Sequence, residues 1–377
     1  MTVIAPLPPP ARVGDLVSAV DTPALLLDLD AFEHNLRKLP ETLAGRPVAI
    51  RPHAKSHKCP EIALRQVALG AVGVCCQKVS EAEALVRGGV TNVLVSNEVV
   101  GAPKLARLAA LAKAARLGVC VDDPINVDDV ADAAREAGAR LDVYVEVNVG
   151  ADRCGVESCA DVVDLSRRIR HSEHLRFAGL QAYIGSAQHV RRFEDRRAAV
   201  DAAVAKVRTI QDLLGAEGLR AGTVTGAGTG TYLFEAASGI YTELQPGSYI
   251  FMDADYGRNL DRDGEPASTF EQSLFILATV MSCAAQGRAV VDAGLKAHSI
   301  DSGMPLVVDV QGARYTRASD EHGVIELDGP DGLTLGQKVR LIPGHCDPTV
   351  NLYDWLVCYR GVQVEALWPI TARGAFY

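Results

Sequence analysis

Between residues 22 and 260 the chain alternates short β-type apolar runs with longer segments of helical spacing. The helical segments are rich in Ala, Leu, Arg and Glu. In one of them, 196–214, a single stripe carries Val200, Val204, Val207, Ile210 and Leu214. Strands that alternate with helices of this length pair in parallel through right-handed crossovers. The pattern predicts an α/β fold with a (β/α)8 barrel of the TIM type and leaves an open doubly wound sheet as the alternative.

Eight apolar runs mark the predicted barrel strands: 24–29, 48–51, 71–76, 92–95, 117–121, 141–147, 177–183 and 222–225. After about residue 266 no long helical segment remains, and turns separate short β-type runs at 273–281, 288–292, 305–310, 323–327, 338–342, 355–359 and 362–368. This texture predicts a second, mostly antiparallel β domain. The expected ranges are 21–265 for the barrel and 266–377 for the β domain, with 1–20 as a candidate part of the latter and 256–271 as the linker.

The composition argues against several classes of partner. The 377 residues include 38 Lys and Arg against 47 Asp and Glu, and this net charge of -9 disfavours a nucleic-acid-binding surface. No run approaches the roughly 18 apolar residues of a membrane span, and the proline-rich start lacks the form of a secretory signal. The nine cysteines lie mostly inside apolar runs, which favours reduced thiols and a cytoplasmic location. We expect neither a nucleic acid nor a membrane as partner.

A basic run, 51–58, follows the second predicted strand and contains Lys55. Lys55 would lie at the carboxyl end of a barrel strand, where the catalytic groups of such barrels cluster. A lysine held among barrel loops loses solvation, which favours the neutral amine that attacks an aldehyde. The alternative is a solvated basic loop, because several other residues of this run carry or can carry positive charge.

Two glycine-bearing segments follow the last predicted strands. The first is 224–231, which reads VTGAGTGT, and the second is 245–249, which reads QPGSY. Glycines let backbone N–H groups approach a phosphate closely, and hydroxyl groups add further donors. Phosphate sites at this end of the barrel are frequent in TIM folds, whereas either segment alone is also compatible with a tight turn.

The segment 343–348, which reads PGHCDP, offers a candidate metal site in the β domain. In an extended segment, residues two apart point to the same side, so His345 and Asp347 would share one ion. An imidazole with a carboxylate suits Mg²⁺, Mn²⁺ or Zn²⁺. The alternative is a turn capped by Asp347 before Pro348.

Together these motifs resemble the D-threonine aldolase family of alanine-racemase-like pyridoxal-phosphate enzymes, which includes the 3-hydroxy-D-aspartate aldolases and is related to the D-serine dehydratases. The resemblance spans nearly the whole chain. It rests on 21–24, 51–60, 73–82, 96–100, 153–156, 179–183, 188–189, the loop around Gly228, 241–253, 292–296, 320–323 and 344–349.

The resemblance implies a homodimer whose active site draws on both subunits. It implies pyridoxal 5'-phosphate bound as a Schiff base to Lys55, a divalent ion at His345 and Asp347, and His189 as the base. The ion would be Mn²⁺ or Mg²⁺, with Zn²⁺ as an alternative. The remaining cofactor-binding residues that it implies are Gln77, Arg153, Tyr183, Thr229, Gly230, Gly247 and Ser248.

The implied reaction is a reversible retro-aldol cleavage of a D-3-hydroxy amino acid to glycine and an aldehyde. D-Threonine would give acetaldehyde, and 3-hydroxy-D-aspartate would give glyoxylate. The alternative is a dehydratase of the D-serine or 3-hydroxyaspartate type that releases ammonia. Asp347 argues against it, since that branch tends to carry Cys as metal ligand at this point. A β domain argues against a single-barrel cofactor-binding protein, and no second acid/base tyrosine is evident for a racemase.

Overall fold

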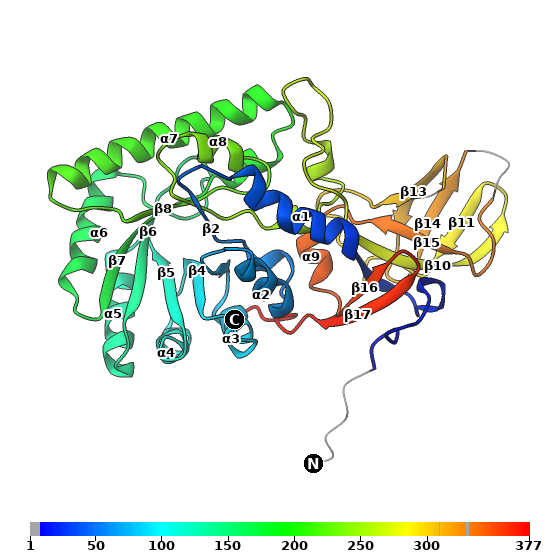
Figure 1. Cartoon of the computed structure of the whole chain (residues 1–377), viewed down its shortest axis with the longest axis horizontal. Coiled ribbons are helices and arrows are strands. Elements are labelled where there is room, and N and C mark those ends of the chain that lie inside the picture. The colour runs from blue at the N-terminus through cyan, green and yellow to red at the C-terminus, as the bar shows by residue number, and fades with distance from the viewer. Residues whose placement is uncertain (1–7, 309, 329–331) are drawn as a thin grey trace, which may run out of the picture. The chain divides into compact units, whose positions relative to one another are not determined.

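A computed structural model describes residues 8–308, 310–328 and 332–377 (Figure 1). The chain divides into two compact units. The first comprises the described residues up to Leu36, Ile250–Gly257 and Ser268–Gly374, and the second comprises Arg37–Tyr249, Arg258–Ala267 and Ala375–Tyr377. The domain ranges expected from the sequence are contiguous, whereas each of these units combines segments from distant parts of the chain.

The second unit contains an eight-stranded parallel sheet in the order β2-β9-β8-β7-β6-β5-β4-β3. Its strands are β2 (Ala49–Ile50), β3 (Val74–Cys76), β4 (Asn92–Glu98), β5 (Arg116–Val121), β6 (Leu141–Glu146), β7 (Leu175–Ala182), β8 (Thr223–Gly226) and β9 (Glu243–Leu244). A parallel bridge between His53 and Cys75 joins the two ends of this order. The hydrogen bond from the Val72 N–H to the Ile50 carbonyl, 2.9 Å long, closes the ring further. The expected TIM-type barrel is confirmed.

Helices lie around the outside of these strands (Figure 1). They are α2 (Pro60–Ala68), α3 (Val79–Arg87), α4 (Ala102–Leu111), α5 (Pro124–Ala137), α6 (Cys159–His171), α7 (Phe193–Ala216) and α8 (Tyr232–Ala237). In α7 the predicted apolar stripe is buried. In α5 the Asp123 carboxylate accepts a 2.7 Å hydrogen bond from the Ile125 N–H, and Gly138 ends the helix in the left-handed conformation. Local capping and an apolar face thus define these helices.

One predicted barrel strand belongs to the other sheet. The run at 24–29 forms β1 (Ala24–Asp28), which pairs antiparallel with β10 (Leu274–Ala285) and parallel with β16 (Trp355–Arg360). The missing barrel strand is β9, which has only two residues. The prediction was wrong because β1 is buried on both faces and is followed by α1 (Leu29–Thr42), so it has the pattern of a barrel unit.

The first unit contains the mostly antiparallel sheet that the sequence predicts, in the order β13-β14-β11-β10-β1-β16-β17, with β15 pairing to β10 and β12. Its other strands are β11 (Arg288–Val291), β12 (Leu306–Val308), β13 (Ala313–Ala318), β14 (Gly323–Leu327), β15 (Lys338–Ile342) and β17 (Gln363–Pro369). Strand β13 was missed because its residues are mostly polar. The predicted run 305–310 includes residue 309, which lies outside the described residues.

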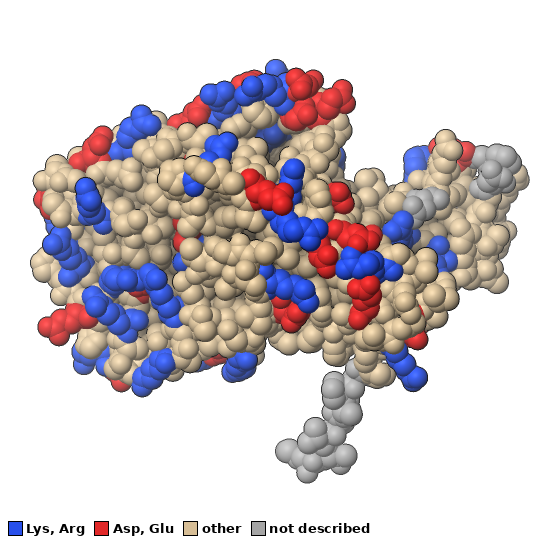
Figure 2. Space-filling model, viewed as in Figure 1, with Lys and Arg blue, Asp and Glu red and all other residues tan. Residues whose placement is uncertain are grey.

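Acidic and basic side chains are interspersed over much of the visible surface (Figure 2).

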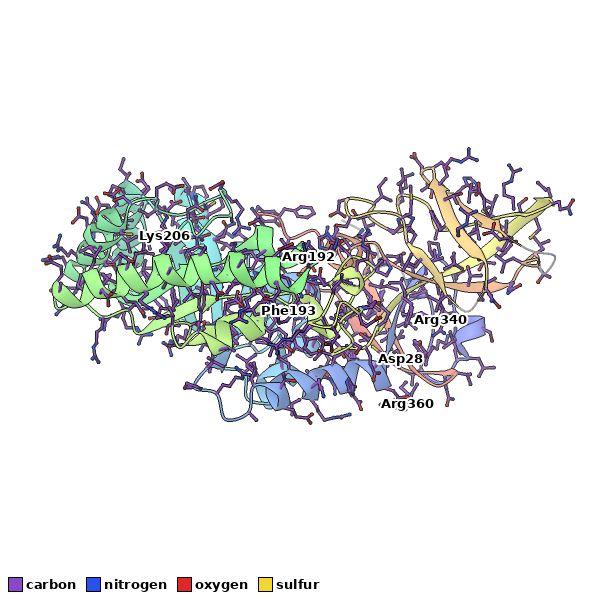
Figure 3. The ribbon with its side chains drawn as sticks, turned by 90° about the horizontal axis from the view of Figure 1, so that it is seen from above. Asp28, Arg192, Phe193, Lys206, Arg340 and Arg360 are labelled. Carbon is purple, nitrogen blue, oxygen red and sulfur yellow. The ribbon has the colours of Figure 1, made fainter. Side chains whose placement is uncertain are left out.

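Polar contacts fix the carboxyl end of β1 in this sheet. The Tyr359 hydroxyl donates to Asp28 at 3.1 Å, and Arg340 donates to that hydroxyl at 3.0 Å. Arg360 pairs with Asp30 and, at 2.9 Å, with Glu33 of α1. Figure 3 labels Asp28, Arg340 and Arg360 of this group. These contacts hold β1 between β10 and β16.

Further features of the described residues bear on partners. Near the chain start, the Gly14 and Val17 N–H groups donate to the carbonyls of Val364 and Val362, each at 2.9 Å, so this segment lies along β17. Within the described ranges, no helix is long and apolar enough to cross a membrane.

Replacing Leu26 with Ala in β1 is expected to lower the free energy of unfolding of the first unit by about 2–5 kcal/mol, because a fully buried leucine leaves a cavity. Both tryptophans of the chain, Trp355 and Trp368, lie in this unit, so denaturant unfolding followed by tryptophan fluorescence reports on it. The control is Leu335→Ala, because Leu335 is 74% exposed and should cost no more than about 0.5 kcal/mol. Equal costs for the two variants would contradict the assigned core.

Candidate active site

Lys55 lies directly after β2, in the short 3-10 turn Ala54–Ser56. The Lys55 N–H donates to His53 Nδ1 at 3.3 Å. The other ring nitrogen of His53 lies 2.8 Å from Gln77 Nε2 and 3.2 Å from Ser96 Oγ. Gln77 follows β3 and Ser96 belongs to β4, so this polar cluster ties the Lys55 turn to the carboxyl ends of the neighbouring strands.

The other lysine of the basic run serves a structural contact. Lys58 adopts a left-handed backbone conformation with a φ of 51°, and its ammonium lies 2.5 Å from the Glu81 carboxylate. Both side chains are almost fully buried. The same carboxylate accepts hydrogen bonds from the Gln77 and Lys78 N–H groups at 2.8 and 2.9 Å. Lys58 therefore fixes the start of α3, whereas Lys55 is half-buried at the strand end.

The two glycine-bearing loops bond to each other and to the Lys55 turn. Thr229 Oγ1 accepts a 3.0 Å hydrogen bond from the Tyr249 N–H, which joins the loop after β8 to the loop after β9. The His53 N–H donates to the Pro246 carbonyl at 3.2 Å. A Cβ added at Gly247 would lie 2.9 Å from the His53 carbonyl oxygen, so glycine is required for this approach. The structure thus brings three predicted motifs together at the carboxyl ends of β2, β8 and β9.

A buried polar network supports the first glycine loop. Gln188 donates through Nε2 to Thr231 Oγ1 at 2.9 Å and accepts through Oε1 from the Gly230 N–H at 3.0 Å. The Thr231 hydroxyl donates to Glu235 of α8 at 2.7 Å. The sequence assigned no role to Gln188 or Glu235, since the partners of this network lie in separate loops. His189 follows Gln188 in the turn Gly185–His189 and is half-buried.

Arg153 and Tyr183, which the resemblance assigns to the cofactor ring, lie near each other. The Arg153 guanidinium is 5.7 Å from the centre of the Tyr183 ring, and it lies 3.6 Å from a carboxylate oxygen of Glu146 at the end of β6. Burial and the neighbouring Glu98 carboxyl raise the pKa of Glu146 well above its ordinary value, and Arg153 opposes this only in part. The Glu146 carboxyl is therefore mostly protonated at neutral pH. Glu98 and Glu146 were not identified from the sequence.

The predicted metal residues lie in the first unit. His345 precedes α9 (Cys346–Val350), and Asp347 lies in the first turn of that helix. The segment is therefore not extended as expected, because Asp347 and Pro348 are both favourable in a first helical turn. Burial opposes the charged imidazole, but Asp347 and other carboxylates outweigh it and raise the pKa of His345.

A third residue orients His345. The Asp301 carboxylate lies 2.7 Å from His345 Nδ1, which leaves Nε2 as the ring atom suited to a metal. No spacing signal marks Asp301, which is 44 residues away in sequence. In the described part of the chain no three His, Cys, Asp or Glu side chains form a metal-binding group. An imidazole with a neighbouring carboxylate is nevertheless a donor set that hard divalent ions accept together with water.

Comparison with known proteins places the chain among aldolases. The alanine racemase N-terminal domain model matches residues 27–255, and a serine dehydratase domain model matches 273–359. The chain is 51% identical to the D-threonine aldolase of an Arthrobacter species, over 98% of this chain and 97% of that protein. It is 50% identical to the 3-hydroxy-D-aspartate aldolase of Paracoccus denitrificans (strain Pd 1222), over 98% of this chain and 96% of that protein. The chain belongs to the D-threonine aldolase and 3-hydroxy-D-aspartate aldolase family.

Structural comparison agrees with membership of this aldolase family. The crystal structure of D-threonine aldolase from Filomicrobium marinum superposes with a TM-score of 0.94 at 51% sequence identity, and covers 98% of this chain and 100% of that one. Dehydratases are more distant: the D-threo-3-hydroxyaspartate dehydratase of a Delftia species is 27% identical, over 96% of this chain and 97% of that protein. The named close relatives are carbon–carbon lyases.

The network under the glycine loop of this family member predicts a dependence of stability on pH. Burial raises the pKa of Glu235 to about 7, and the Thr231 hydroxyl opposes this only in part. The fold therefore loses stability as pH rises from the ordinary value of 4.5 through about 7, since the buried carboxyl must ionise. Ionising this buried carboxyl lowers the free energy of unfolding by at most about 3 kcal/mol across that pH range.

Glu235→Gln is expected to gain stability relative to the parent protein as pH rises from 5 to 8, measured as the thermal midpoint by circular dichroism. The exposed Glu136→Gln is the matched control and should track the parent protein at every pH. A constant difference between Glu235→Gln and the parent across this range would show that Glu235 does not titrate there.

Proposed function

We propose that the protein is a pyridoxal-phosphate- and divalent-metal-dependent aldolase that cleaves D-3-hydroxy amino acids to glycine and an aldehyde. The observation that carries the proposal is the mutual bonding of the Lys55 turn with the glycine loops after β8 and β9. The identity of about half with two named aldolases over nearly full length supports the same reaction.

The residues at the glycine loops fit a cofactor phosphate. Thr229 and Ser248 are buried hydroxyl residues on adjoining loops, and hydroxyls of this kind donate to phosphate oxygens. The Gly230 N–H already donates to Gln188, so Gly230 contributes through its shape: an added Cβ would collide with the Gln188 carbonyl oxygen. Gly247 is likewise required by the contact with His53. The result is a compact cradle beside Lys55.

Lys55 would hold the cofactor aldehyde, and Gln77, Arg153 and Tyr183 would surround the ring. When bound, pyridoxal phosphate supplies an electron sink for the carbanion that remains when the Cα–Cβ bond breaks. Because burial and Glu98 raise the pKa of Glu146, its carboxyl offsets little of the charge of the Arg153 guanidinium, which lies 3.6 Å away. His189 would take the proton of the substrate β-hydroxyl, directly or through a water molecule.

His345 and Asp347 would hold the divalent ion, and Asp301 would fix the imidazole so that Nε2 faces it. An ion there supplies Lewis-acid polarisation of the β-hydroxyl. Mn²⁺ and Mg²⁺ suit the nitrogen and oxygen donors, and Zn²⁺ is the alternative.

The proposal extends to assembly and location. A homodimer, with an active site drawing on both subunits, would give a mass near twice the 40.1 kDa of the chain in light scattering. None of the nine cysteines, all of which lie in the described residues, forms a disulfide, and six of them are buried, which supports a reducing compartment such as the cytoplasm.

Lys55→Ala is expected to lose the long-wavelength absorbance of the bound cofactor and to lower activity by about 10³-fold or more, because Lys55 supplies the amine that would hold the cofactor aldehyde. The assay offers D-threonine and 3-hydroxy-D-aspartate side by side, with products identified. The control is Lys113→Ala, an exposed lysine, which should retain both signals. If the products are ammonia and a keto acid rather than glycine and an aldehyde, the aldolase proposal is wrong and the dehydratase hypothesis is favoured.

Chelation is expected to abolish cleavage, and Mn²⁺ or Mg²⁺ to restore it. Asp301→Asn should raise the Mn²⁺ concentration required for restoration by about 10–100-fold, since the carboxylate orients the metal-binding imidazole. Direct Mn²⁺ binding by electron paramagnetic resonance gives a readout independent of turnover. The exposed Asp320→Asn is the control and should behave as the parent protein. Full activity in excess chelator would exclude the metal role.

A further inference from the structure

A cavity of about 390 Å³ opens at the end of the barrel opposite Lys55. Arg140 precedes β6, Leu175 and Arg176 begin β7, and Arg220 lies just before β8, so the cavity belongs to the amino ends of these parallel strands. Arg170 in the last turn of α6 completes its basic lining. Figure 2 shows Lys and Arg side chains gathering at the left of the visible face, in the region that α6 and β7 occupy in Figure 1.

The lining contains four arginines and no acidic residue. Arg176 pairs with Asp142 through two hydrogen bonds, one from Nε to Oδ1 at 2.5 Å and one from Nη2 to Oδ2, and Arg116 donates to the same carboxylate at 2.8 Å. Arg170 donates to the Gly218 carbonyl at 3.1 Å. Among the residues that the structure describes, no carboxylate forms an ion pair with Arg140, Arg170 or Arg220. Three uncompensated cations therefore surround one cavity in a chain whose net charge is -9.

Neither packing nor the proposed reaction accounts for this arrangement. Arg140 and Arg220 are exposed and come from different connections, so they add repulsion without making a described contact. Guanidinium groups match the oxygens of phosphate in a bidentate manner and hold such anions more specifically than lysine does. Leu175 and Leu219 are buried beside the arginines and give the cavity an apolar floor.

We propose that this cavity binds a phosphate-bearing small molecule, of the size of a phosphate ester or a mononucleotide, at a site separate from the cofactor cradle. The volume lies in the range of small-ligand sites, which favours a small molecule over an extended macromolecular strand. Free inorganic phosphate shares the chemistry that the arginines recognise, so the test separates it from organic phosphates.

The experiment titrates the cofactor-loaded holoenzyme, in low-salt buffer free of phosphate, with inorganic phosphate, pyrophosphate and AMP by isothermal calorimetry. Binding of AMP or pyrophosphate is expected to be at least tenfold tighter than that of inorganic phosphate and to weaken with added salt. Arg140→Gln with Arg220→Gln should weaken the tightest probe at least tenfold. Because the two arginines make no described contact, the thermal midpoint should not fall, and aldolase activity without the probe should stay unchanged.

Arg208→Gln is the matched control, since Arg208 is an exposed arginine of α7 without a described partner and outside the cavity lining. It should bind the probes as the parent protein does. Absence of binding by all three probes would overturn the proposal, as would equal affinity in the double variant. Binding of a single-stranded oligonucleotide in preference to AMP would overturn it in favour of a nucleic-acid surface. Because aldolase activity is assayed separately, these outcomes are distinct from failure of the proposed function.

Discussion

The buried ion pair between Arg51 and Glu243 is the interaction on which the candidate site depends. Arg51 follows β2 and Glu243 begins β9, and their side chains meet at 2.8 Å with almost no solvent exposure. The Thr225 hydroxyl of β8 donates to the same carboxylate at 2.8 Å, and Arg51 also donates to Asn92 of β4 at 3.0 Å. Removing one partner of such a pair costs about 3–5 kcal/mol, because the other charge stays buried.

This pair matters because the strands it joins are very short. Strands β2 and β9 have two residues each, yet they carry the loops of Lys55 and Gly247. Their ladder continues past the strands: the Arg51 N–H donates to the Leu244 carbonyl at 2.9 Å, and the His53 N–H donates to the Pro246 carbonyl at 3.2 Å. The site is thus held by the buried pair and by loop-to-loop hydrogen bonds more than by strand length.

The sequence predicted the parts of this arrangement that local pattern encodes. Lys55 and the first glycine loop were placed because each directly follows a predicted strand, and parallel strands end at one edge of a barrel. The second glycine loop follows β9 and was recognised only from its glycine-bearing turn. Strand β9 was missed because two residues, one of them the charged Glu243, show no periodicity. The contact of Asp301 with His345 had no local signal, since the fold alone brings the two side chains together. Asp347 lies in the first turn of α9, where an extended segment was expected, because the local residues favour a helical turn.

Two buried basic side chains at one end of the barrel are paired with carboxylates, whereas two exposed arginines at the other end have no described carboxylate partner, and the difference follows from their burial. At the carboxyl end, Arg51 and Lys58 are buried and each has a carboxylate partner, because an unpaired buried charge would be too costly. At the amino end, Arg140 and Arg220 are exposed, so water lowers the cost of leaving them without carboxylates. In the folded protein these two guanidinium groups therefore have no carboxylate partner among the described residues. Their positive charge stays available to an anion, and the shape of the cavity determines which anions can use it.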